Sequence, residues 1–115
     1  MNAPVKDLVV AWTDVGAVTD IPRRGARRVP SPQGDIAIFR TGEDQVYALV
    51  DSCPHKGGPL SQGIVHGHSV TCPLHGRIIS LATGEGLGAD KGAGCARTVP
   101  LEVRDGRLFL GRIGV

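Results

Sequence analysis

Two short segments of this 115-residue chain place cysteine and histidine close together. The first segment contains Cys53 and His55, and the second contains Cys72 and His75. Both segments also contain proline and glycine, which fix the shape of a loop and let its backbone approach an inorganic group closely. Thiolate and imidazole are the side chains that bind zinc, copper and iron in proteins. The sequence therefore predicts one metal centre with Cys53, His55, Cys72 and His75 as its ligands.

Spacing alone leaves three interpretations of these four residues open. Zinc accepts two cysteines and two histidines, but its ligand pairs are usually two or more residues apart, and only Pro54 separates Cys53 from His55. A two-iron, two-sulfide cluster with cysteines on one iron and histidines on the other needs two loops that each offer one residue of either kind. The third interpretation is an accidental pairing of buried cysteines with exposed histidines. The matched pairs favour the iron–sulfur cluster.

Composition limits the classes of protein to which the chain could belong. Thirteen basic and eleven acidic side chains give a net charge of +2, without the charged tail that nucleic-acid binding proteins often carry. No apolar run approaches the ~20 residues of a membrane span, and the first residues do not resemble a secretory leader. Three cysteines, an odd number, make a poor disulfide framework. We expect a cytoplasmic protein with no nucleic-acid partner and no membrane association.

The hydrophobic pattern predicts short strands rather than helices. Seventeen glycines and eight prolines favour many tight turns, and no stretch of ten residues has helical periodicity. Two hairpins are expected, each with a polar connection that contains glycine. The predicted strands cover residues 35–40 and 45–50 in the first hairpin and 99–104 and 107–110 in the second, with a further strand over residues 8–11 followed by a polar loop.

All four histidines and two of the three cysteines fall within residues 51–94, which show little periodicity. We therefore expect one all-β domain over residues 1–115. In this domain, antiparallel strands from residues 5–50 and 95–113 form a scaffold. Residues 51–94 form an inserted subdomain that binds the cluster.

The pattern Cys-x-His followed by Cys-x-x-His resembles the Rieske iron–sulfur family. This resemblance implies an all-β Rieske domain with a 2Fe-2S cluster. It also implies that Cys53 and Cys72 bind the inner iron and that His55 and His75 bind the outer iron. One-electron transfer is the chemistry that the family resemblance implies, and no catalytic residue is expected on this chain.

Several stretches resemble the small subunit of NAD(P)H-dependent nitrite reductase: residues 53–61, 63–65, 81–85, 88–90 and 94–100. The resemblance implies a partner, a large subunit with flavin, another iron–sulfur cluster and sirohaem that reduces nitrite to ammonia. No substrate site is then expected on the small chain itself. The alternative is a free Rieske ferredoxin that delivers electrons to an aromatic-ring dioxygenase. A third hypothesis is a non-redox subunit in which the cluster only stabilises the fold.

Other polar residues have simpler explanations. A basic cluster is either a docking surface or, more commonly, a solvated face. Two histidines between the ligand segments are expected to be exposed, and the third cysteine is expected to be buried as a small apolar residue. These are Arg23, Arg24, Arg27 and Arg28 in the basic cluster, the histidines His66 and His68, and Cys95.

Overall fold

The computed structural model describes residues 9–31, 34–52, 59–73, 76–87 and 96–113. The described residues form nine β-strands and two one-turn 3₁₀ helices, and they contain no α-helix. The strands are β1 (Val9–Ala17), β2 (Gly25–Val29), β3 (Ile36–Arg40), β4 (Val46–Val50), β5 (Ile64–His66), β6 (Ser69–Thr71), β7 (Ile78–Ser80), β8 (Leu101–Arg104) and β9 (Arg107–Ile113). The expected all-β fold is confirmed.

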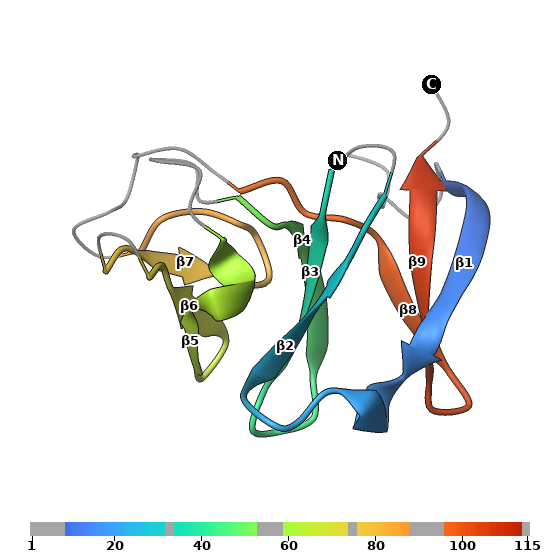
Figure 1. Cartoon of the computed structure of the whole chain (residues 1–115), viewed down its shortest axis with the longest axis horizontal. Coiled ribbons are helices and arrows are strands. Elements are labelled where there is room, and N and C mark those ends of the chain that lie inside the picture. The colour runs from blue at the N-terminus through green and yellow to red at the C-terminus, as the bar shows by residue number, and fades with distance from the viewer. Residues whose placement is uncertain (1–8, 32–33, 53–58, 74–75, 88–95, 114–115) are drawn as a thin grey trace, which may run out of the picture.

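The strands form three antiparallel sheets of three strands each. The strand orders are β1-β9-β8, β2-β3-β4 and β5-β6-β7. In Figure 1 the β2-β3-β4 sheet stands between the other two, so we call it the middle sheet. The β5-β6-β7 sheet lies within the segment predicted to bind the cluster, and the β1-β9-β8 sheet stands on the other side of the molecule.

The middle sheet is buried on both faces. Ile36 and Ile38 of β3 join a core shared with the β1-β9-β8 sheet, whereas Ala37 and Phe39 join a core shared with the β5-β6-β7 sheet. All four side chains are at most 2% exposed. A strand buried on both faces needs a continuous apolar run, and residues 36–39 provide one.

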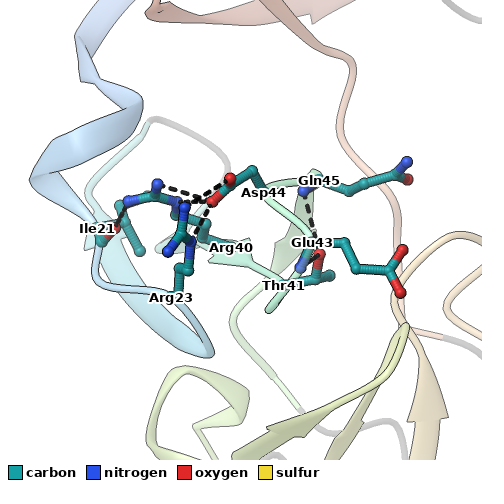
Figure 2. A network of polar contacts seen from close by, with 7 residues as sticks. All are labelled: Ile21, Arg23, Arg40, Thr41, Glu43, Asp44 and Gln45. Atoms are coloured by element: carbon teal, nitrogen blue, oxygen red, sulfur yellow. Dashed lines mark hydrogen bonds and ion pairs between the residues drawn. The ribbon is translucent and has the colours of Figure 1, made fainter.

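Both predicted hairpins are confirmed. Strands β3 and β4 pair with Ile36 opposite Val50, and β8 and β9 pair with Leu101 opposite Leu110. In the β3–β4 turn the buried Thr41 hydroxyl accepts hydrogen bonds from two backbone N–H groups, as Figure 2 shows. Turn residues that lie between the strands in the sequence were therefore enough to predict both hairpins.

The expected loop after residue 11 is wrong, because β1 continues to Ala17 and β2 follows at Gly25. Both strands lie at the edges of their sheets, where one side of the ladder faces solvent and polar side chains are common. Thr13 and Asp14 in β1 and Arg27 and Arg28 in β2 are accordingly exposed. Because of these polar residues, β2 and the second half of β1 contain no apolar run from which a strand could be predicted.

Residues 51–94 also contain more regular structure than their hydrophobic pattern indicates. Strands β5, β6 and β7 have three residues each, which is too short to show periodicity. Val65, Val70 and Ile79 stand in register across them and are buried. None of the helices in the described part of the chain has the length and hydrophobicity needed to cross a membrane.

Candidate metal centre

Cys72 is the one predicted ligand that falls within the described residues. It directly follows β6, is 1% exposed, and packs in the core with Val70 and Ile79. Cys53, His55 and His75 lie outside the described residues, as does Cys95. Within the described ranges no three Cys, His, Asp or Glu side chains gather as a metal site, so the four-residue ligand set stays a prediction.

The segment that begins at Cys72 is closed by two backbone hydrogen bonds. The Cys72 N–H donates to the Arg77 carbonyl at 2.7 Å, and the Gly76 N–H donates to the Cys72 carbonyl at 3.0 Å. Gly76 has a φ of 69°, a left-handed conformation that suits glycine. These bonds join the two ends of the connection between β6 and β7. This connection is the part of the sequence that contains the second Cys–His pair.

The first Cys–His pair belongs to a segment whose two ends are joined. Asp51, the residue after β4, accepts hydrogen bonds from Ser61 at 2.7 Å through the backbone N–H and at 2.6 Å through the hydroxyl. Ser61 lies in the 3₁₀ helix η3 (Leu60–Gln62), and Leu60 is fully buried in the core that contains Cys72. Both predicted ligand segments are thus anchored to the same core.

This arrangement fits a 2Fe-2S cluster with two thiolate and two imidazole ligands. A cysteine buried among apolar side chains suits a thiolate bound to iron, because an unpaired thiolate would pay a large desolvation cost there. The two backbone hydrogen bonds of Cys72 join the ends of the segment that follows it, which suits the close approach of an inorganic group. The predicted donor set is that of a centre in which histidines replace two cysteines on one iron.

The two histidines between the ligand segments are exposed, as expected. The Nε2 atom of His66 lies 2.7 Å from the Thr71 hydroxyl. His68 Nδ1 lies 3.3 Å from the Tyr47 hydroxyl, and the two rings meet edge to face at 6.2 Å between centroids. Both histidines therefore interact with neighbouring residues of the chain.

The basic cluster is largely paired within the chain. Arg23 forms two hydrogen bonds to the Asp44 carboxylate, and Arg28 lies 2.9 Å from that of Asp51. Arg27 donates to the Val15 carbonyl at 3.0 Å. These contacts support a structural role for the arginines on the edge strand β2 and the residues before it. Sequence reasoning missed this role because these hydrogen-bond partners lie 12 to 23 residues away in the chain.

Comparison with known proteins decides the family. The model of the Rieske [2Fe-2S] domain matches residues 11–99, which is most of the chain. The chain belongs to the Rieske family. A Rieske domain contains a 2Fe-2S cluster, so the cofactor expected from the sequence is confirmed.

The proteins similar to this chain include a ferredoxin among its relatives and a nitrite reductase small subunit among solved structures. Ferredoxin CarAc of Metapseudomonas resinovorans is 33% identical over 105 residues, which cover 86% of this chain and 92% of the relative. The carbazole 1,9a-dioxygenase complex of reduced oxygenase and oxidized ferredoxin includes a chain that is 30% identical, with a TM-score of 0.77 and coverage of 87% and 92%. A chain assigned as an NADH-dependent nitrite reductase small subunit of Mycobacterium tuberculosis has a TM-score of 0.81 and 24% identity, with coverage of 91% and 97%. The last similarity shows the fold alone.

Proposed function

We propose that this chain is a Rieske ferredoxin, a one-electron carrier that delivers electrons to an oxygenase. The observations that carry the proposal are the match along almost the whole of ferredoxin CarAc and the match to a chain of the carbazole 1,9a-dioxygenase complex of oxygenase and ferredoxin. The similarity to nitrite reductase small subunits has a lower sequence identity. We therefore propose the ferredoxin function ahead of the nitrite reductase subunit, which the sequence motifs favour.

In this proposal Cys53 and Cys72 bind one iron, and His55 and His75 bind the other. The bound cluster supplies a single-electron couple whose potential depends on its ligands and on the hydrogen bonds around it. Burial of Cys72 keeps water away from the thiolate side of the site. Each histidine has a second ring nitrogen, which can hold a proton or donate a hydrogen bond to a partner protein.

A small subunit of NAD(P)H-dependent nitrite reductase is the second candidate, and the resemblance of residues 94–100 to that subunit favours it. Residues 97–99, part of a stretch that resembles that subunit, pair with β4 through a bridge between Leu49 and Thr98. The stretch therefore has a defined place beside the middle sheet. The partner in this case is a large subunit with flavin, iron–sulfur cluster and sirohaem.

One purification tests both candidates. The protein is isolated anaerobically from the cells that express it naturally, and iron, sulfide and sirohaem are measured on the same sample. Electron paramagnetic resonance (EPR) spectra are recorded before and after reduction by dithionite. We expect about two irons and two sulfides per chain and a rhombic signal only in the reduced sample. The variants Cys72→Ser and His75→Ala are expected to lose that signal.

The results separate the hypotheses. A chain that carries the cluster and purifies without sirohaem supports the ferredoxin. A stable complex that contains sirohaem supports the nitrite reductase subunit and contradicts the ferredoxin proposal. A colourless protein with one zinc per chain contradicts both. If Cys72→Ser removes the cluster but leaves an assembled, fully active complex, the cluster has only a structural role.

A further inference from the structure

Asp51 is a buried carboxylate at the start of the segment that contains the first Cys–His pair. Its side chain is 0% exposed, although aspartate is seldom fully buried unless it is paired. Its backbone N–H donates to the Asp35 carbonyl at 2.8 Å, which attaches this residue to the beginning of β3. Such a carboxylate needs specific partners, and they come from two other parts of the chain.

The first partner lies at the far end of the same segment. The Ser61 backbone N–H bonds one Asp51 oxygen at 2.7 Å, and the Ser61 hydroxyl bonds the other at 2.6 Å. Next to Ser61, Leu60 is fully buried against the middle sheet. Asp51 therefore joins the two ends of the stretch that includes Cys53 and His55 in the sequence.

The second partner belongs to the scaffold. The Nε atom of Arg28, on the edge strand β2, lies 2.9 Å from the Asp51 carboxylate. The guanidinium group compensates the buried negative charge, and charge-assisted hydrogen bonds of this kind are stronger than neutral ones. One carboxylate thus links both ends of the first ligand segment to the middle sheet.

We propose that Asp51 is a positioning residue for the 2Fe-2S cluster. It joins the two described ends of the segment that contains Cys53 and His55 in the sequence and anchors them to β2, so that these ends are fixed before the iron binds. Closing this segment in advance removes part of the entropy cost of cluster binding. Groups that orient metal ligands typically change metal affinity by about 10- to 100-fold. The inference depends on the ligand assignment proposed above.

The substitution Asp51→Asn tests this role with a matched control. The amide has almost the size of the carboxylate, but its NH₂ group would face donors on Ser61 or Arg28. The control is Asp35→Asn, which removes the same charge 3.7 Å from the same Arg28, at a side chain that is 48% exposed. Both holoproteins are treated with an iron chelator, and loss of visible absorption is followed. The EPR line positions of the reduced proteins are compared.

We expect the cluster of Asp51→Asn to be lost about tenfold faster than that of the wild type, with shifted EPR lines. Asp35→Asn should match the wild type in both measurements. Ser61→Ala should also accelerate loss, and Ser61→Thr should restore the wild-type rate because it restores the hydroxyl group. Far-UV circular dichroism should show unchanged strand content in all these variants.

Equal rates and equal spectra for Asp51→Asn and Asp35→Asn would overturn the positioning role. If Asp51→Asn does not fold, the variants Ser61→Ala and Ser61→Thr test the positioning role instead. Faster loss in Ser61→Ala with rescue in Ser61→Thr supports the role, and equal rates overturn it. A wild-type chain that binds no 2Fe-2S cluster would overturn the proposed function and this inference together. Failure of the inference alone leaves the wild-type cluster intact.

Discussion

At the scale of single residues, the sequence predicts a ligand set because its chemistry is local to two short motifs, and this set stays a prediction. The polar residues that support the fold were harder to predict, because some of their partners are distant. An example is Asp44, one of whose two arginine partners lies 21 residues before it in the chain. It accepts hydrogen bonds from Arg23 and Arg40, and Arg40 also donates to the Ile21 carbonyl at 2.7 Å (Figure 2). In the sequence, Asp44 shows only as a polar turn residue.

These arginines lower the pKa of Asp44 from 3.8 to about 2, mainly through hydrogen bonds from Arg23 and then Arg40. Because the pKa is lower in the folded state, the ionised carboxylate stabilises the fold above pH 4 or so, and this contribution is lost as the pH falls towards about 2. Asp44→Asn should therefore have a lower thermal unfolding midpoint than the wild type at neutral pH. The difference should shrink as the pH is lowered from about 4 to about 2.

Circular dichroism at a series of pH values checks this prediction. Asn tolerates the φ of 66° at residue 44, so the substitution adds little backbone strain. Asp105→Asn is the control, because Asp105 also has a positive φ but forms no ion pair with any described residue. Loss of the cluster in acid affects all three proteins and cancels in the comparison. A difference between Asp44→Asn and the wild type that is independent of pH would contradict the prediction.

At the scale of elements, the two hairpins were predictable because glycine and polar turn residues lie between their strands. The short strands β5, β6 and β7 were not, because three residues show no periodicity and their buried side chains pack against distant parts of the chain. Gly84 shows such a contact after β7. Its N–H donates to the Ser80 carbonyl at 2.8 Å, and its own carbonyl accepts from the Ala96 N–H at 2.7 Å. Gly84 thereby joins the cluster-binding segment to the chain that returns towards β8.

Gly84→Ala should destabilise the protein more than an ordinary substitution of glycine. Gly84 has a φ of 78°, and a Cβ atom here would collide with the Ala96 carbonyl oxygen. The unfavourable φ costs about 1 kcal/mol, and the collision adds about 1–3 kcal/mol. Gly67→Ala is the control, because Gly67 has a φ of 56° with no atom within 4 Å of the added Cβ. In urea unfolding, Gly84→Ala should have a lower midpoint than Gly67→Ala, and the difference between them measures the steric cost. Equal midpoints would exclude this cost.

At the scale of the whole molecule, the all-β class followed from turn residues and strand patterns. The arrangement of the sheets did not, because the apolar run of residues 36–39 indicates a strand buried on both faces but not which sheets cover it. Since the middle sheet contributes to both cores, each outer sheet depends on it. The proposed subdivision into a scaffold and a cluster-binding subdomain therefore describes topology. For stability, we expect residues 1–115 to behave as one unit.

Two spectroscopic probes test this single unit. Trp12, the only tryptophan, lies on β1, whereas the visible absorption reports on the predicted cluster site, whose one described ligand, Cys72, directly follows β6. In anaerobic urea unfolding, tryptophan fluorescence and visible absorption should change with the same midpoint. Ile38→Val removes a methylene group from the core beside β1-β9-β8 at a cost of about 1 kcal/mol, and it should lower both midpoints equally. If it shifts the fluorescence transition alone, the middle sheet does not couple the two cores, and the cluster-binding part unfolds independently.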